Sequence, residues 1–484
     1  MQRRAFCKTG ALALGGLTLA GSHRGWAAGE VTLADAKVRA LRARLKGQLL
    51  LAGDAGYDAA RKPWNGAFDK HPALIARCAN AADVARSVEF ARTHALPLAL
   101  RGGGHSFAGY SSLDGGLLID LSPMRQVRID RAAGSVRVEA GALLADVDRE
   151  SLAANLVTST GTVSHTGVAG FALGGGFGRL ARKLGLACDN LIGADVVTAD
   201  GRAIRASAND NADLFWALRG GGGNFGAVTA FEFRAHPSPR TIGGAVVFAF
   251  EKPRELLRAY ADFSAAASDE FFAMVDIVPT PEGKRIMAVE VCHCGDDATV
   301  ERELATLRKI GTVVNDTVQS APYATLQAGI DSHYPAGRGY YLKSGFVRDI
   351  TPALIEATVN HLEAASAPAP FCIASFLQLG GAISRVDPKA TAYWHREAGH
   401  QVLLAGVWDE SENAAPRQQW VRQGWSRLEP HTDGFYVNLL APDEAGLRIR
   451  NTYGANYQRL AAIKQRYDPT NLFRLNANIA PAAA

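Results

Sequence analysis

Apolar residues recur along the first half of the chain with the spacing of short helices and strands. Val84, Val88 and Ala91 lie at helical spacing and predict the buried face of a helix. Asn80 precedes them as a capping residue, and we expect the helix to extend to Ala95. The remaining pattern predicts strands at residues 96–100, 116–121, 127–129, 135–140 and 191–198, and helices at roughly 33–50 and from Leu143 onward.

From about Thr241 the pattern changes. Residues 244–250 and 272–278 are apolar runs and residues 287–291 alternate, and all three predict strands that helical stretches separate. Such an order indicates an antiparallel sheet with helices on one face. Because 484 residues are too many for one ordinary hydrophobic core, the sequence predicts an α+β protein of two domains.

The N-terminus has the composition of an export signal. Arg3 and Arg4 precede the apolar run of residues 11–20, which is too short to span a bilayer, and small residues follow near residues 25–27. We therefore predict a twin-arginine signal peptide over residues 1–27, which the Tat translocase would carry to the periplasm or out of the cell. The alternative is a weakly apolar N-terminal helix. No later stretch has about 18 uninterrupted apolar residues, so no membrane span is expected in the mature chain.

Charge and cysteine content narrow the classes of function. The formal net charge is +5, and loss of the four basic residues of the predicted signal leaves +1, without a lysine- and arginine-rich block, so no nucleic-acid partner is expected. Five cysteines remain outside the signal; an odd number cannot all form disulfides, and their pairing stays open. Cys292 and Cys294 share one face of a predicted strand, where core packing is favoured over a metal site because no second ligand pair accompanies them.

Glycine is clustered at residues 102–104, 174–178 and 220–223. Without a Cβ, backbone N–H groups can approach a phosphate closely; the alternative is three ordinary tight turns. None of the clusters is a P-loop, since no Gly-Lys-Ser/Thr follows. Residues 221–226 match the GxGxxG dinucleotide motif. However, residues 227–233 predict a strand where that motif requires a helix, so we reject the match.

Motifs rich in glycine, asparagine and aromatic residues follow one another over most of the chain. The first is Arg101-Gly102-Gly103-Gly104-His105-Ser106, with Gly109-Tyr110 close behind. The full series occupies residues 101–110, 161–178, 189–201, 214–226, 436–438, 453–456 and 464–479.

This series resembles the FAD-linked oxidases of the vanillyl-alcohol oxidase/p-cresol methylhydroxylase (PCMH) superfamily, and within it the berberine bridge enzyme-like oxidases. The resemblance implies a two-domain α+β fold of the PCMH type. Residues 28–240 would form an FAD-binding domain of two α+β subdomains, and residues 241–430 an antiparallel-sheet substrate domain. Residues 431–484 would return to the FAD-binding domain.

In that family a histidine of the first loop bonds the 8α-methyl group of the flavin, which points to His105 as the covalent attachment site for FAD. Many relatives add a second bond from a cysteine at the position that Val163 occupies here, so a single bond is expected, as in the 6-hydroxy-nicotine oxidase branch. The resemblance assigns cofactor contacts to Arg101, Gly102, Gly103, Gly104, His105, Ser106, Gly109, Tyr110, Gly161, Ser164, His165, Thr166, Gly167, Gly170, Gly174, Gly175, Gly176, Gly178, Asp189, Asn190, Val196, Tyr436, Asn438, Asn476 and Asn478.

Several relatives remove the substrate's proton with a tyrosine directly after the asparagine of a Tyr-x-Asn motif, and here that position is Leu439. Alternation on a predicted strand faces Tyr341 and Lys343 the same way. A lysine beside a flavin can take a proton at lowered pKa or hold negative charge on the reduced ring, and the alternative for Lys343 is a structural salt bridge. The catalytic candidates are Lys343, Tyr341 and Tyr436, with Gln378 and His395 also open.

The resemblance implies that hydride passes from a CH–OH or CH–NH group of a small organic substrate (a sugar, alcohol, alkaloid or amine) to FAD. Dioxygen would then be reduced to hydrogen peroxide. A dehydrogenase that passes electrons to a quinone or a protein, and a non-catalytic flavin-binding protein, remain alternatives. Covalent attachment suits an exported enzyme, because no FAD is available outside to replace a lost cofactor.

Overall fold

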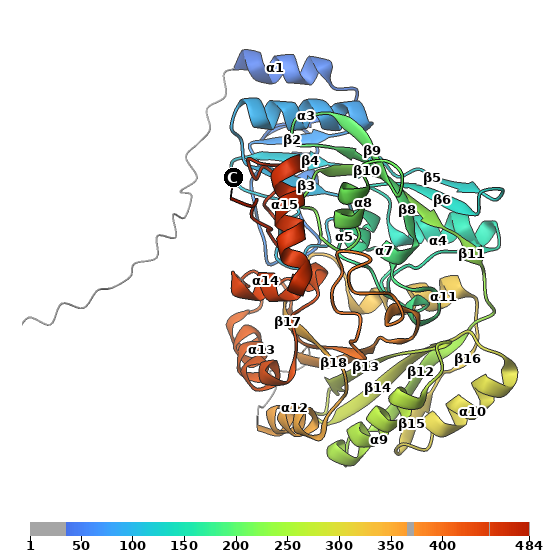
Figure 1. Ribbon diagram of the computed structural model, residues 1–484. Helices are drawn as coiled ribbons and strands as arrows, with labels where there is room; N and C mark the ends of the chain where they lie inside the picture. Colours follow the sequence, from blue (N-terminus) through green and yellow to red (C-terminus); the bar gives the residue numbers. More distant parts are fainter. Residues whose placement is uncertain (1–34, 365–371, 445, 484) are drawn as a thin grey trace, which may run out of the picture.

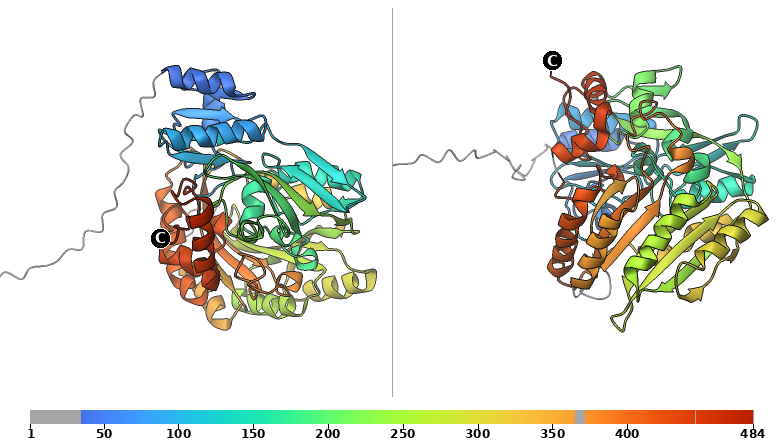
Figure 2. Two further views of the ribbon diagram at one scale, coloured as in Figure 1. Left: turned by 45° about the horizontal axis from the view of Figure 1, so that its top comes forward. Right: turned by 60° about the horizontal axis from the view of Figure 1, so that its bottom comes forward.

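The computed structural model describes residues 35–364, 372–444 and 446–483, so the predicted signal peptide lies outside the described part (Figure 1). Two small sheets with their helices lie above one large sheet in this view, and the views in Figure 2 agree. The mixture confirms the predicted α+β class. No helix among the described residues is both long and apolar enough to cross a membrane.

Four short strands form the first sheet, in the order β1-β2-β4-β3. β2 (Leu74–Arg77), β4 (Leu117–Asp120) and β3 (Leu98–Arg101) are parallel and almost wholly buried, as expected for strands covered on both faces. The connection from β2 to β3 is α3 (Ala81–Thr93). Its start confirms the predicted cap, because the Asn80 side chain accepts a hydrogen bond from a backbone N–H of the first turn.

The helix predicted over residues 33–50 is wrong in its second half. α1 (Asp35–Arg44) ends early, and β1 (Gln48–Leu50) instead pairs antiparallel with β2. Gly47 allows the chain to come this close to the sheet, because a Cβ there would lie 2.0 Å from the carbonyl oxygen of Arg77. The apolar residues that continued the helical pattern therefore face the core from a strand.

The second sheet is antiparallel and shares one hydrophobic core with the first. α4 (Leu144–Ala153) and α8 (Ala212–Leu218) pack into the same core. A strand follows the GxGxxG string, as predicted, and it lies at the centre of this sheet. In spatial order the strands are β5 (Val127–Asp130), β6 (Ser135–Glu139), β10 (Ala227–Arg234), β8 (Leu191–Val197) and β9 (Ala203–Ser207).

The large sheet is antiparallel throughout, and α9 (Pro253–Ala266), α10 (Asp297–Leu307), α12 (Pro352–Ala364) and α13 (Ala415–Leu428) cover one of its faces (Figure 2). This arrangement confirms the sheet predicted after residue 241. In spatial order its strands are β15 (Val313–Asp316), β12 (Ile242–Ala249), β14 (Arg285–His293), β13 (Phe271–Pro279), β18 (Cys372–Gln378), β19 (His400–Trp408) and β17 (Gly339–Val347), with β16 (Gln319–Ser320) beside β12.

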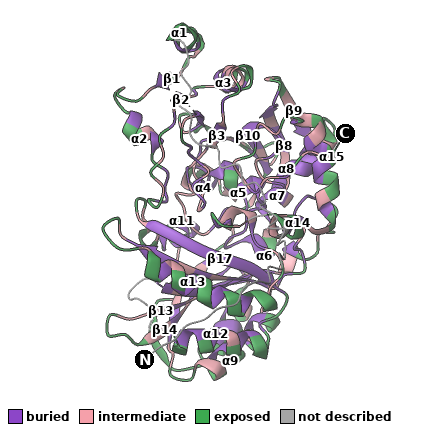
Figure 3. Ribbon diagram, turned by 90° about the vertical axis from the view of Figure 1, so that its left-hand side faces the viewer, coloured by how far each residue is buried: buried purple, intermediate pink, exposed green. Residues whose placement is uncertain are grey.

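Alternate residues of the large sheet face two different cores. On β19, Val402 and Leu404 pack against the helices, whereas Leu403 faces the two small sheets. On β17, Tyr341 belongs to the helix side and Tyr340 to the opposite side. β17 is buried along its whole length (Figure 3), so its side chains pack on one face of the sheet or the other.

The C-terminal segment returns to the small sheets, where α15 (Tyr457–Tyr467) packs beside α8 (Figure 1). Lys464 is fully buried, and its Nζ donates to Asp468 Oδ2 at 2.6 Å, to the Asn224 carbonyl at 2.7 Å and to the Phe473 carbonyl at 2.9 Å. The remaining elements are α2 (Tyr57–Arg61), β7 (Leu156–Val157), α5 (Val168–Leu173), α6 (Ala181–Leu184), α7 (Ala187–Asn190), β11 (His236–Pro237), α11 (Tyr323–Ala328), α14 (Leu447–Tyr453) and the short 3-10 turns Asp331–His333, Gly381–Ile383, Glu429–His431, Val437–Leu439 and Gly454–Asn456.

Candidate active site

A cavity of about 390 Å³ lies between the glycine-rich loops of the small sheets and the inner face of the large sheet. The loop after β3 and the segment around residues 161–170 form one side. Strands β17, β18 and β19 form the other side, and the C-terminal segment closes the cavity with residues 436–440 and 473–477. Of the predicted site residues, those on its wall are Gly102, Gly103, Gly104, His105, Ser106, Tyr110, Gly161, Thr166, Gly167, Gly170, Tyr341, Tyr436, Asn438 and Asn476.

The loop after β3 is held from below by Arg101. This buried guanidinium donates to the backbone carbonyls of Ser111, Ala60 and Arg61, and its burial lowers the pKa of the group. Arg101 therefore supports the loop and does not itself line the cavity.

His105 lies at one end of a stack of three rings with Trp64 in the middle. Its Nε2 lies 2.7 Å from Nδ1 of His165, and its ring stacks on Trp64 at 4.1 Å, which in turn stacks on Tyr340 at 4.1 Å. Burial, followed by the neighbouring His165, lowers the pKa of His105 to about 3, so the imidazole is neutral at pH 7. Among the described residues, no hydrogen bond engages its Nδ1.

Ser164 ties the loop that carries His165 to the segment before β17. Its backbone N–H donates to Asp331 Oδ1 at 2.8 Å, and its hydroxyl donates to Asp331 Oδ2. Ser164 and His165 do not line the cavity themselves. They fix the position of their neighbours Val163 and Thr166, which line the cavity.

The glycines of residues 174–178 are not on the cavity wall, and the cofactor contacts assigned to Gly174, Gly175, Gly176 and Gly178 stay predictions. A Cβ on Gly174 would lie 2.2 Å from Asn438 Oδ1, and the N–H of Gly176 donates to the Tyr436 hydroxyl at 3.0 Å. Asn438 Nδ2 donates to the same hydroxyl at 2.7 Å. This cluster is therefore glycine-rich because the C-terminal segment packs directly on its backbone.

Five other predicted contacts also lie off the wall. Asp189 accepts two hydrogen bonds of 2.7 Å from the buried Arg396. Asn190 Nδ2 donates to the carbonyls of Leu184 and Leu186, so it stabilises the turn between α6 and α7. The five residues are Gly109, Asp189, Asn190, Val196 and Asn478.

Of the candidate bases on β17, Tyr341 borders the cavity although its side chain packs in the helix-side core, and Lys343 lies on the same face of the strand as Tyr341. Lys343 Nζ forms ion pairs with Asp443 at 2.8 Å and Glu444 at 3.0 Å, and it does not line the cavity. The Tyr341 hydroxyl donates to Asp443 at 2.8 Å, and burial raises its pKa. The two residues share a face as predicted, but the contacts of Lys343 are those of the structural salt bridge.

Gln378 and His395 lie off the wall as well. Gln378 Nε2 donates to the Ser264 carbonyl, and the His395 ring stacks on Phe346 at 4.6 Å. The wall instead contains residues that no motif marked: Trp64, Phe107, Met274, Tyr334, Tyr340, Gln401 and Leu403. The alternation of β17 and β19 was a usable signal for Tyr340, Gln401 and Leu403, because neighbours in a strand face opposite sides.

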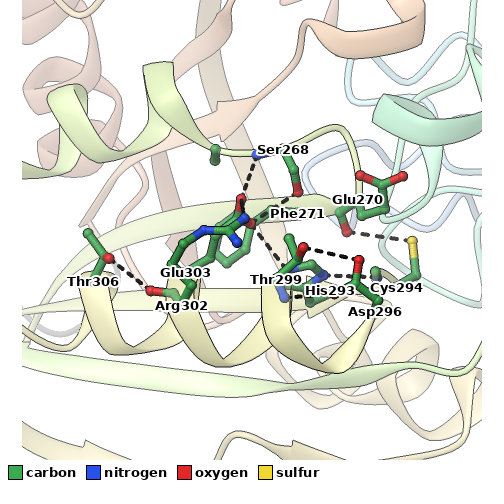
Figure 4. Close-up of polar contacts among 12 residues, drawn as sticks. Ser268, Glu270, Phe271, His293, Cys294, Asp296, Thr299, Arg302, Glu303 and Thr306 are labelled. Carbon is green, nitrogen blue, oxygen red and sulfur yellow. Dashed lines mark hydrogen bonds and ion pairs between the residues drawn. The ribbon is translucent and has the colours of Figure 1, made fainter.

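The segment Cys292-His293-Cys294 forms part of the core. Both thiols are buried and unoxidised, as are Cys78, Cys188 and Cys372. His293 Nδ1 accepts from the Gly295 N–H at 3.1 Å, and its Nε2 lies 3.1 Å from Glu303 Oε2 (Figure 4). This contact ties the end of β14 to α10. The described residues contain no group of three or more His, Cys, Asp and Glu side chains placed to hold a metal ion.

The wall fits a flavin dinucleotide. At Gly103 the loop touches Gly167 so closely that a Cβ would lie 2.5 Å from its backbone, and Gly222 and Gly223 present further backbone to the cavity. Asn476 Oδ1 is buried and has no hydrogen-bond partner in the described part of the chain, as expected for an atom that meets a bound ligand. Fold and cavity together define an FAD-linked oxidoreductase.

Comparisons with known proteins agree with this assignment. The family described as FAD binding domain matches residues 72–207, and the family described as Berberine and berberine like matches residues 435–480. The (R)-6-hydroxynicotine oxidase of Paenarthrobacter nicotinovorans is 32% identical over 90% of this chain and 97% of its own. An FAD-linked oxidoreductase of Dictyostelium discoideum is 31% identical over 87% and 91%. The chain belongs to the berberine bridge enzyme-like family of FAD-linked oxidoreductases.

Solved structures give the same result. The structure of 6-hydroxy-D-nicotine oxidase from Arthrobacter nicotinovorans superposes with a TM-score of 0.84 at 31% identity and covers 90% of this chain and 98% of its own. A chitooligosaccharide oxidase also has a TM-score of 0.84, at 25% identity, covering 92% and 100%. The predicted α+β fold of the PCMH type is therefore confirmed.

Proposed function

We propose that this protein is an oxidase that holds FAD through one covalent bond to His105. It takes hydride from a CH–OH or CH–NH group of a small organic substrate and passes the electrons to dioxygen. The observation that carries this proposal is the position of His105 on the cavity wall, with Nε2 held by His165 and a neutral ring. A neutral imidazole offers a nitrogen lone pair for bond formation.

The chain's own residues would position cofactor and substrate. When bound, FAD supplies the two-electron acceptor. The loop of residues 102–104, together with Asn438 and Asn476, would hold it from one side. Val163 lies on the wall and offers no thiol for a second bond. The apolar residues of β18 and β19 exclude water from the opposite side, which strengthens polar interactions inside the cavity.

Tyr436 is the base candidate that lies on the wall without an ion-pair partner. Its hydroxyl oxygen accepts hydrogen bonds from Gly176 and Asn438, and both contacts would stabilise the deprotonated form that a base requires. Burial raises the pKa of Tyr436, and the two donated hydrogen bonds oppose that rise. If Tyr436 takes the substrate's proton, the rate of flavin reduction rises with pH above neutrality, and Tyr436→Phe removes that dependence.

The covalent bond is tested by denaturing the holoprotein in acid and separating it on a gel. Flavin fluorescence should stay with the polypeptide in the wild type and in His71→Ala, a change at an exposed position, and it should be lost in His105→Ala. Release of free FAD from the wild type would contradict the bond.

The oxygen reaction is tested separately. The flavin is reduced under anaerobic conditions and mixed with oxygenated buffer in a stopped-flow instrument. Rapid return of the oxidised spectrum with formation of hydrogen peroxide supports an oxidase. Slow return with oxygen and rapid return with a quinone would identify a dehydrogenase instead.

We also propose the domain limits and the export route. Residues 28–240 and 431–484 would hold FAD, and residues 241–430 would form the substrate domain; every strand of the large sheet falls within the latter range. The pair Arg3-Arg4 supports Tat-dependent export of the folded protein to the periplasm or beyond. Replacing both arginines with lysine should leave the protein, with its flavin, in the cytoplasmic fraction.

A further inference from the structure

The cavity wall points to the chemistry of the substrate. We propose that the substrate is an uncharged molecule with an apolar body of about ring size and one hydrogen-bond acceptor, and that Gln401 donates to that acceptor. This inference rests on the proposed function, because it concerns the same cavity. The inference goes beyond the proposed function because it distinguishes among sugars, alcohols and amines as substrates.

Charge is kept away from the cavity. No Asp, Glu, Lys or Arg is found on its wall within the described part of the chain. Lys343 is directed to the helix side, and Glu290, although it lies on a nearby strand, pairs with Arg179 at 2.7 Å. Asp276 lies on the same face of β13 as Met274 and is half-buried, but it is not on the wall, and burial raises the pKa of both carboxyl groups. A charged substrate would lose its hydration without gaining a partner at the wall.

The sheet side of the cavity is apolar. The alternation of β19 sends Val402 and Leu404 to the helices and leaves every second residue facing the cavity. The same holds for β17 and β18. The apolar side chains that these three strands present to the cavity are Leu342, Ile373, Leu377, Leu403, Ala405 and Val407.

Polar groups at the wall are largely occupied. The Tyr340 hydroxyl donates to the Pro335 carbonyl at 2.6 Å, and Asn438 Nδ2 donates to Phe171 and Tyr436. A sugar would bury several hydroxyl groups that find no partner here, and each would weaken binding by roughly tenfold to a hundredfold. The cavity also has to take the cofactor, so the space left suits a body of one or two rings.

Gln401 is the exception on the sheet. It is 1% exposed, its strand neighbours across the sheet are Leu377 and Phe346, and its Nε2 has no hydrogen-bond partner among the described residues. A buried donor without a partner is unfavourable, so an acceptor on the substrate gains affinity by satisfying it. Gln401 thus distinguishes a ligand with an acceptor from one of the same shape without it.

The test uses the oxidised holoprotein and follows the visible spectrum of its flavin during titration. Acetophenone and ethylbenzene have nearly the same shape, and only the former has an acceptor. Benzoate, benzylammonium and glucose represent anions, cations and sugars. We expect acetophenone to bind about tenfold more tightly than ethylbenzene, and the three other probes to bind at least about tenfold more weakly than acetophenone.

Gln401→Met keeps the volume and removes the donor, so the tenfold preference for acetophenone should disappear while ethylbenzene binds as before. Gln423→Met, at an exposed position of α13, is the matched control and should keep the preference. Glucose or either ion binding as tightly as acetophenone, an unchanged preference in Gln401→Met, or no spectral change with any probe would overturn the proposal. The titration needs bound flavin but no turnover, so a failed oxygen reaction does not alter it.

Discussion

Replacing Lys464 with methionine removes a fully buried charge and keeps most of the side-chain volume. The change deletes three hydrogen bonds of 2.6–2.9 Å and leaves the Asp468 carboxylate, also fully buried, without its cation. The N–H groups of Leu472 and Phe473 still donate to that carboxylate. Breaking one partner of a buried ion pair costs about 3–5 kcal/mol. For 484 residues the unfolding entropy is about 1 kcal/mol per degree, so the midpoint should fall by about 3–5 °C.

The measurement is thermal unfolding followed by circular dichroism and by flavin fluorescence. Arg466→Met on the same helix is the control, because Arg466 is 67% exposed and its pair with Asp213 contributes little. Fluorescence should change at or below the temperature of the circular dichroism transition, since Lys464 holds Asn224 and Phe473 together next to the cavity. A fall of less than 1 °C, or equal falls in the two variants, would refute the assignment of this pair as the main anchor of the C-terminal segment.

Three further predictions concern the site and the large sheet. Gly103→Ala should lower the flavin content of the purified protein at least about tenfold, measured by absorbance, because its Cβ would lie 2.5 Å from the Gly167 backbone; unchanged content would contradict this. Lys343→Met should lower the unfolding midpoint and leave the rate of flavin reduction within about threefold, because Lys343 pairs with Glu444 and not with substrate; a loss of about a hundredfold would restore it as a base. Burial lowers the pKa of His361 to about 4 from about 6.5 in the unfolded chain. As pH falls, His361 is therefore protonated in the unfolded chain before it is protonated in the folded protein. The free energy of unfolding should fall by about 3 kcal/mol between about pH 6.5 and about pH 4, and urea titrations measure this fall. The substitution His361→Phe should make the free energy of unfolding depend less on pH in this range.

Strand β17 shows what the sequence could and could not predict. Alternation correctly placed Tyr341 and Lys343 on one face. Which face meets the cavity depends on α13, formed much later in the chain, which packs against β17 and β19. The period of a strand carries no information about which of its two buried faces meets a ligand.

The glycine cluster of residues 174–178 was also only partly predictable from the sequence. The sequence predicted that another group packs closely on this backbone, because glycine has no Cβ. The partner was not readable, since Asn438 comes from a distant segment that returns to pack on Gly174. Trp64 carried no motif at all, and its role depends on stacking between His105, in the loop after β3, and Tyr340 on β17. Local patterns therefore predicted helices and strands, whereas contacts between distant segments required the fold.

The cavity is closed by residues 473–477, which follow the strands of all the sheets in the chain. Its opposite wall, around Trp64 and the loop after β3, is made near the beginning. A fragment that stops before Lys464 lacks the C-terminal part of the wall and also lacks the contact of Lys464 with the Asn224 carbonyl. Because residues 473–477 form part of the cavity wall, a fragment that ends before Lys464 should retain less flavin than the chain that contains them.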